Sequence, residues 1–129
     1  MKVNKRNHFE LACKTLKLDP SKLPDVSVLL EEFARPVIAL YKLQVIIKAW
    51  NGSWVPNWNN SEPKWCCLWW MDEPGFRFFG VYDDVSSACS TGGSRLAFVS
   101  EKLAEKAGKE LDYLFADLMG GELPKKSAA

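Results

Sequence analysis

The longest apolar segment of the chain, residues 37–50, carries hydrophobic side chains around almost the whole circumference of a helix. A helix of this kind is normally buried on most sides, so we expect it to form the centre of the core. Pro36 leaves two possibilities: a short helix at Val28–Ala34 followed by one from Pro36 to Trp50, or one kinked helix. Asn51-Gly52 provides a left-handed stop at its end.

Shorter periodic segments on either side complete the predicted fold. Asn7 can cap a first short helix, and Ser100 can cap a last one that ends at Gly120-Gly121. Three strands are expected between them, at Lys64–Met71, Phe76–Asp83 and Arg95–Val99. This order predicts an α+β fold with two or three N-terminal helices, a three-stranded antiparallel sheet and one C-terminal helix packed on it. We expect a single globular domain over residues 1–121 and a flexible tail over residues 122–129.

The first two predicted strands are apolar on both faces. Alternate residues of a strand share a face. In the first strand, Trp65, Cys67, Trp69 and Met71 therefore lie opposite Cys66, Leu68 and Trp70. In the second, Phe76, Phe78 and Tyr82 lie opposite Arg77, Phe79 and Val81. Because the predicted helices cover one face more easily than two, we expect some aromatic surface to contact a loop, a partner or a ligand.

Composition and charge narrow the setting of the protein. All six tryptophans of this 129-residue chain lie between Trp50 and Trp70. The formal net charge is +1, so no global field would gather polyanions. No signal peptide and no apolar run long enough to cross a bilayer are evident, which favours a cytoplasmic protein with no membrane contact. In that setting Cys13, Cys66, Cys67 and Cys89 are expected to stay reduced.

The residues that could carry catalysis or bind a metal are poorly arranged. The chain has one histidine and no CxxC motif, so we expect no metal site and no cofactor. Gly92-Gly93 lacks the companion glycines and the lysine of a phosphate-binding loop. His8 and Cys13, five residues apart on a helix, point in different directions. We therefore do not expect an enzyme.

Several short segments resemble a family of small uncharacterised proteins of Bacteroides-type gut bacteria and their phages and prophages. The resemblance covers roughly residues 9–119. The segments that carry it are Phe9–Lys14, Leu18–Pro20, Trp58–Ser61, Gly93–Ser100 and Leu103–Gly108. It implies a phage or mobile-element origin and a cytoplasmic setting, and it assigns no activity. Members of that family usually carry tyrosines where this chain has Cys66, Cys67 and Trp69.

Three uses of the tryptophan-rich centre follow. The loop after Asn51 can fold back so that Trp54 and Trp58 seal the second face of the sheet. Otherwise an aromatic surface binds a protein partner or a second copy of the chain, and the alternative ligand is single-stranded nucleic acid. The expected binding residues are Trp54, Trp58, Trp65, Trp69, Trp70, Phe76, Phe78 and Tyr82, flanked by Arg77 and Arg95. Arg95 is further expected to pair with Asp83 or Asp84.

Overall fold

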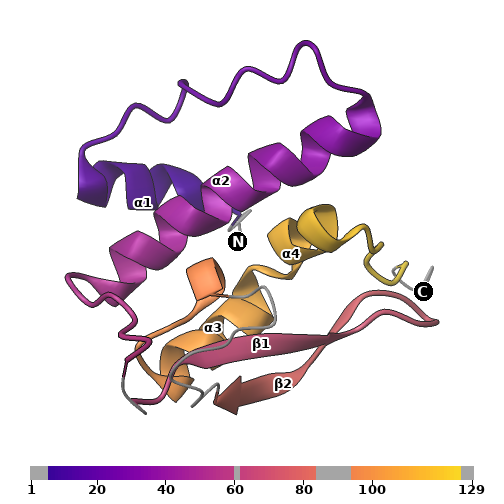
Figure 1. The fold of residues 1–129 in the computed structure, drawn as a ribbon. Coiled ribbons are helices and arrows are strands. Elements are labelled where there is room, and N and C mark those ends of the chain that lie inside the picture. The colour runs from indigo at the N-terminus through magenta and orange to yellow at the C-terminus, as the bar shows by residue number, and fades with distance from the viewer. Residues whose placement is uncertain (1–5, 60–61, 84–93, 126–129) are drawn as a thin grey trace, which may run out of the picture.

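The computed structural model describes residues 6–59, 62–83 and 94–125. Its elements are α1 (His8–Leu16), α2 (Glu31–Asn51), β1 (Trp65–Trp70), β2 (Arg77–Asp83), the short 3-10 helix η1 (Ser94–Leu96), α3 (Glu101–Glu110) and α4 (Asp112–Met119). Figure 1 shows the sheet at the bottom, α3 and α4 above it, and α2 with α1 at the top. The predicted α+β class is confirmed.

α2 is one continuous helix, which decides between the two possibilities left open at Pro36. Pro36 lies inside the helix, close to its start. The first turn is closed by the amides of Phe33 and Ala34, which both donate to the Leu30 carbonyl. The helix ends as predicted at Gly52, whose φ of +67° a residue with a Cβ rarely adopts.

α1 packs against α2 through Phe9, Ala12 and Cys13, which are all buried. Asn7 occupies the N-cap position as predicted, but its side chain makes no capping hydrogen bond. Its backbone carbonyl instead accepts from the Leu11 amide, the first bond of the helix. The buried apolar face, more than a cap, therefore holds α1 in place.

The sheet has two described strands instead of the three predicted. β1 and β2 pair antiparallel around the turn that follows Trp70. The segment predicted as a third strand, Arg95–Val99, begins inside η1 and contributes one isolated bridge, in which Phe98 pairs with Trp65. The segment leaves no room for a longer pairing, because η1 ends at Leu96 and Ser100 already caps α3.

A β-bulge in β2 changes which side chains share a face of the sheet. Leu68 pairs with Gly80 but Trp69 pairs with Phe78, so Phe79 is an extra residue between them. Phe78 and Val81 consequently both face α3 and the core, whereas regular alternation would place them on opposite faces. The prediction that Phe78 and Tyr82 share a face is therefore wrong. A bulge depends on pairing with another strand and leaves no pattern in the sequence.

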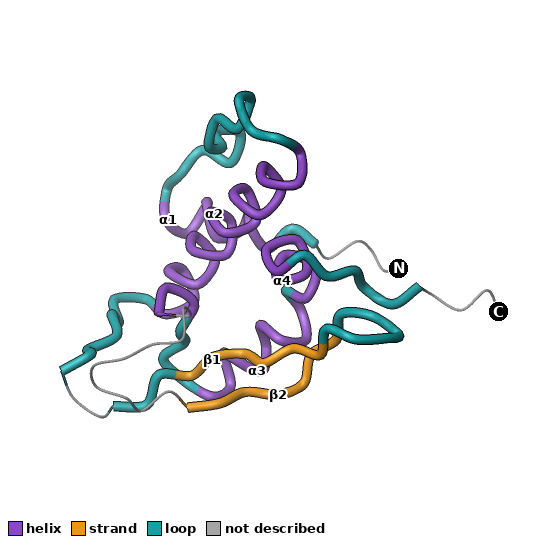
Figure 2. The backbone as a smooth tube through the Cα atoms, turned by 45° about the vertical axis from the view of Figure 1, so that its right-hand side comes forward, coloured by secondary structure: helices purple, strands orange, loops and turns teal. Residues whose placement is uncertain are grey.

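The predicted C-terminal helix is split into two. The Ser100 hydroxyl caps α3 by accepting from the Leu103 amide at 3.2 Å, as predicted. The helical path breaks at Leu111, which is fully buried. Figure 2 shows the consequence: α3 runs along the inner face of the sheet, and α4 turns away to pack on α2.

The segment expected to be a loose tail begins with a backbone contact. The Phe76 amide donates to the Glu122 carbonyl at 2.6 Å, and Leu123 packs against the core. Residues 126–129 lie outside the described residues. Within the described part of the chain, no helix is both long enough and apolar enough to cross a membrane.

Candidate functional site

The structure does not bring the ten expected binding residues into one surface. They separate into three groups: an aromatic layer inside the core, an outer face of the hairpin, and a groove at the end of α2. Only the last two include exposed side chains.

The core group consists of Trp65, Trp69, Phe76 and Phe78. The Trp69 ring stacks on Phe76 at 4.8 Å between centroids and contacts Phe115 of α4 at the same distance. Phe76 is only 1% exposed. These rings fill the space between the sheet and the two C-terminal helices, so their role is packing.

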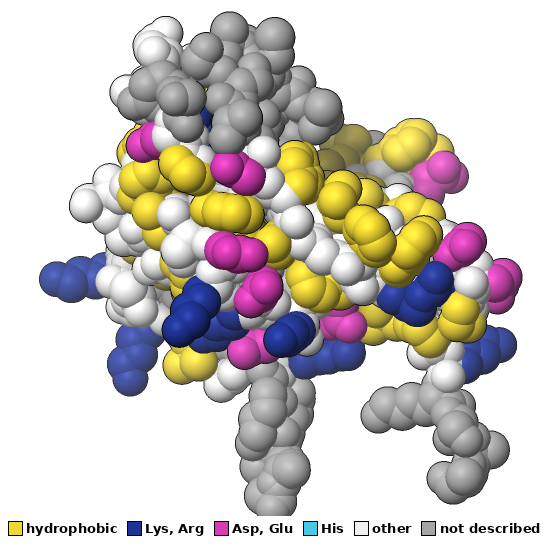
Figure 3. Space-filling model, turned by 90° about the horizontal axis from the view of Figure 1, so that it is seen from below, with side chains coloured by type: hydrophobic (Ala, Val, Ile, Leu, Met, Phe, Trp, Pro, Cys, Tyr) yellow, Lys and Arg dark blue, Asp and Glu magenta, His cyan; other side chains and the backbone are white. Residues whose placement is uncertain are grey.

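The outer face of the hairpin presents a small apolar surface, visible from below in Figure 3. Trp70 and Phe79 contact each other edge to face at 4.7 Å and are 45% and 56% exposed. Tyr82 pairs with Cys66 farther along the same face. The loop after Asn51 does not seal this face, because Leu68, Trp70 and Phe79 all stay exposed.

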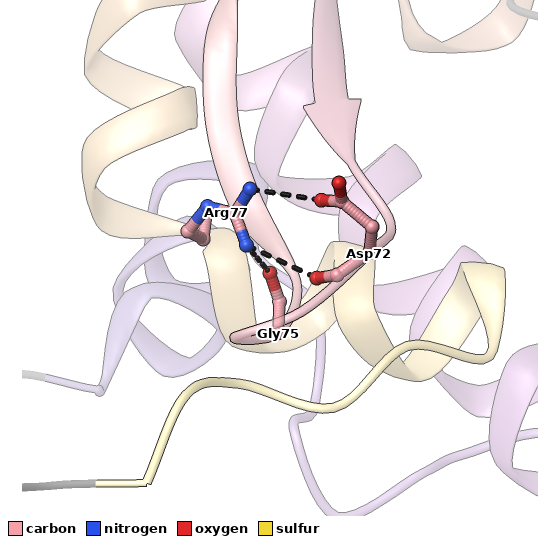
Figure 4. Close-up of polar contacts among 3 residues, drawn as sticks. All are labelled: Asp72, Gly75 and Arg77. Atoms are coloured by element: carbon pink, nitrogen blue, oxygen red, sulfur yellow. Dashed lines mark hydrogen bonds and ion pairs between the residues drawn. The ribbon is translucent and has the colours of Figure 1, made fainter.

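Arg77 is a structural side chain of the hairpin turn. Its guanidinium donates to the carbonyls of Asp72 and Gly75 and forms an ion pair with the Asp72 carboxylate at 2.9 Å (Figure 4). It also lies over the Trp70 ring at 5.9 Å. With these contacts made, Arg77 is poorly placed to hold a ligand.

The third group, Trp54, Trp58 and Arg95, meets at a groove of about 480 Å³ at the C-terminal end of α2. This volume lies within the range of small-ligand sites. One wall is the last turns of α2, another is the loop that carries both tryptophans, and the third is η1 with Ala97. Lys48 joins the lining from α2. Nothing in the sequence marks Lys48 as a site residue, because it shares this groove with Arg95 only once η1 has docked.

The walls of the groove are fixed by backbone hydrogen bonds. The Asn51 amide group donates to the Ala97 carbonyl at 3.0 Å, and its oxygen accepts from the Val99 amide at 2.9 Å. In the loop, the Asn57 amide donates to the Glu62 carboxylate at 2.8 Å. Asn51 therefore holds η1 against α2, a role additional to ending the helix.

The electrostatics of the groove are one-sided. Its two charged lining residues, Lys48 and Arg95, are both cationic and exposed, and no carboxylate in the described part of the chain lines it. The predicted partner of Arg95, Asp83, instead accepts from the Lys64 backbone amide at 3.1 Å. Among the described residues Arg95 forms no ion pair. Asp84, its other expected partner, lies outside them.

A second exposed feature lies on α2 itself, which the sequence predicts to be buried on most sides. Leu30, Phe33 and Val37 are 63%, 54% and 40% exposed. Leu40, which is half-buried, continues the row. The spacing of three, four and three residues places Phe33, Val37 and Leu40 on one face of the helix, with Leu30 at its N-cap. We call these four residues the α2 seam. Val28 and Leu29, 90% and 40% exposed, extend it at the start of the helix.

The cysteine and histidine side chains described next are the candidates for catalysis, and they lie in structural environments. The Cys67 thiol donates to the Ala104 carbonyl, and burial raises its pKa to about 12. Burial also raises the pKa of Cys13, which is fully enclosed. His8 contacts the Tyr113 hydroxyl at 2.9 Å and the Glu110 carboxylate at 3.2 Å. His8 and Cys13 thus sit in different environments.

The described cysteines, Cys13, Cys66 and Cys67, form no disulfide. In the same described part of the chain, no cluster of three or more potential ligands is placed to hold a metal. Cys89 lies outside it. Comparisons with protein-family models, curated proteins and solved structures give no match.

Proposed function

We propose that this protein acts by binding and not by catalysis, and that it self-associates through the α2 seam. The single observation that carries the proposal is the exposed apolar row on a helix whose adjacent faces are packed against α1 and α4. Apolar side chains that recur every three and four residues are the pattern by which one helix pairs with another. The occupant to which this geometry points is the α2 seam of a second copy.

The orientation of the pair follows from charge. Glu31 and Glu32 begin α2 next to the seam. Parallel pairing would bring these glutamates of the two copies together, whereas antiparallel pairing centred on Phe33 places Glu31 opposite the partner's Arg35. Centred on Phe33, the antiparallel arrangement places Phe33 against the partner's Phe33, and Leu30 against the partner's Val37. The same contacts form twice, as two-fold symmetry requires.

The exposed apolar area sets the expected strength of self-association. The seam, with Val28 and Leu29, exposes on the order of 300 Å² of apolar side chain per copy. With the polar rim included, a symmetric pair would bury about 1,000 Å², the lower limit of specific interfaces. We therefore expect a weak dimer with a dissociation constant in the micromolar range or above.

The outer face of the hairpin is a less suitable place for the same role. Trp70 and Phe79 already cover part of each other, and the bulge at Phe79 interrupts the edge of β2. Bulges of this kind discourage a second strand from pairing with an exposed edge. Phe79 nevertheless provides a matched control, because its exposure of 56% almost equals the 54% of Phe33.

Sedimentation velocity from about 10 µM to about 1 mM tests the proposal. The wild-type chain should sediment increasingly as a dimer. Phe33→Ser removes about 100 Å² of apolar contact from each copy, so the dissociation constant should rise at least about 100-fold. Phe79→Ser should leave it unchanged. A wild-type monomer at the highest concentration, or equal effects of the two substitutions, would overturn the proposal.

We also propose a cellular location and an origin for the protein. The resemblance of Trp58–Ser61 and Gly93–Ser100 to phage and prophage proteins supports a small cytoplasmic accessory protein of mobile-element origin. Labelled protein expressed in a bacterial host should appear in the cytoplasmic fraction after cell lysis. Recovery in the periplasm would contradict this assignment.

A further inference from the structure

We propose that the groove at the end of α2 binds single-stranded nucleic acid, with bases stacked on Trp54 and Trp58 and phosphates held by Lys48 and Arg95. This site is distinct from the α2 seam. Lys48 lies fifteen residues beyond Phe33 on the same helix, which at 1.5 Å per residue is about 22 Å.

The charges that line the groove match a polyanion. Lys48 and Arg95 contribute two positive charges, and the other polar lining residues, Gln44 and Asn51, are neutral. A second groove, between the start of α2 and α4, shows the opposite balance. Among the described residues, its charged lining residues are Glu31, Glu32, Asp117 and Glu122, with one cation, Arg35. The cationic groove is therefore a local feature of a chain whose net charge is only +1.

Two indole rings beside two cations suit planar bases joined by phosphates. Trp54 and Trp58 are both half-buried, which anchors each ring while part of it stays accessible. Lys64 lies 4.9 Å from the Trp58 ring centre, so this indole is held from one side. Sequence-tolerant binding of single strands uses the same combination of stacking rings and a positive groove. An acidic peptide could use the cations but offers no row of flat rings.

The groove is held in shape before any ligand arrives. Asn51 ties η1 to α2, and the Trp54 amide donates to the Asn51 carbonyl at 3.3 Å. The Asn59 amide donates to the Asn57 side chain at 2.9 Å and shapes the loop around Trp58. A preformed site loses less conformational entropy on binding, so a small number of contacts can suffice.

The first experiment measures fluorescence anisotropy of a labelled oligothymidylate of about twelve nucleotides, titrated with the full chain at several salt concentrations. Two neutralised phosphates predict a log–log salt slope of about −1.4, and hence about a sevenfold loss of affinity between 50 and 200 mM salt. Lys48→Gln and Arg95→Gln should each reduce the slope by about half. Lys102→Gln, an exposed lysine on α3 outside the groove, is the control. No binding at low salt, or equal slopes for all variants, overturns the proposal.

The second experiment tests stacking. Trp54→Leu and Trp58→Leu should each weaken binding about fivefold or more, while Trp70→Leu, on the outer face of the hairpin, should not. Thermal melts identify any variant that has lost its fold, and the two charge variants keep the test valid in that case. An acidic peptide of equal charge that competes as well as the oligonucleotide overturns the assignment to nucleic acid. Thymidine monophosphate that binds as tightly as the oligomer overturns the assignment to a strand.

Self-association through the α2 seam and nucleic-acid binding at the groove can be tested independently. Phe33→Ser should abolish self-association and leave binding of a short oligonucleotide within about twofold of wild type, since the seam contributes no lining residue to the groove. Loss of both properties in this variant, with the fold intact, would show that the groove is incomplete in a single copy and would overturn the inference as stated.

Discussion

Asn51→Ala is the substitution that most directly tests the architecture of the groove. The Asn51 side chain makes two hydrogen bonds to backbone groups of one segment, to the Ala97 carbonyl and from the Val99 amide. Alanine removes both. It leaves two backbone groups that must find water, at a site that is partly buried on the Ala97 side.

The expected loss can be worked from these contacts. Each hydrogen bond contributes about 0.5–1.5 kcal/mol to stability. Alanine favours the helix over asparagine by about 0.5 kcal/mol, which offsets part of the loss. The free energy of unfolding should therefore fall by about 1–2 kcal/mol. For a chain of this length that lowers Tm by about 4–8 °C.

Thermal denaturation followed by circular dichroism measures the effect. Asn51→Asp keeps an acceptor for the Val99 amide but places a carboxylate beside the Ala97 carbonyl, so it should destabilise the protein more than alanine does. Asn57→Ala is the control, because the Asn57 side chain serves only an exposed bond from the Asn59 amide. A Tm for Asn51→Ala within about 1 °C of wild type, with Val99 amide exchange unchanged, would refute the reasoning.

Two further predictions concern the hairpin and its inner face. Gly75→Ala should lower the free energy of unfolding by about 2–4 kcal/mol in urea denaturation, because φ is +145° and the new methyl would lie 2.8 Å from the Glu122 carbonyl oxygen. Gly80→Ala, with open space around it, should change it by less than about 1 kcal/mol. Cys67 should resist iodoacetamide at pH 8 in the folded protein, since its pKa is about 12. Its buried neutral thiol stabilises the fold fully below pH 9.0, and this contribution should be lost as the pH rises from 9.0 toward 12.

The sequence predicted the features that local chemistry decides. The stop at Gly52 and the Ser100 cap depend on a few neighbouring residues, and both are present. The antiparallel hairpin around Asp72-Glu73-Pro74-Gly75 is likewise a local turn between two apolar strands. These features needed no knowledge of what lies across the core.

Long-range contacts decided the features that were missed. The bulge at Phe79 arises only when β2 is aligned with β1. The predicted third strand is reduced to one bridge because η1, which docks on α2, takes up its first residues. The break at Leu111 lets one apolar helix pattern serve two partners, the sheet and α2. Periodicity within a segment cannot reveal any of these.

Contacts between residues distant in the sequence also decided which of the expected binding residues are accessible. The apolar residues on both faces of the first two predicted strands indicated that some aromatic side chains stay exposed. Trp70 is such a side chain. The sequence does not reveal which face of the hairpin α3 and α4 cover, so Trp69 and Phe76 were included among the expected binding residues. The expectation that α2 is buried on most sides did not single out an exposed row. The exposed seam could have been suspected from its spacing of three and four residues starting at Leu30.

The apolar circumference of α2 has a structural explanation that connects the two proposed sites. Two of its faces are used inside the molecule, against α1 and against α4, and a third remains for the seam. An antiparallel pair centred on Phe33 would place the two grooves at opposite ends, about 45 Å apart along the joined helices. A stacked strand advances about 3.4 Å per nucleotide, so about thirteen nucleotides are needed to reach both grooves. Shorter strands must occupy one groove at a time, and longer strands gain from the second groove only while the seam holds the two copies together.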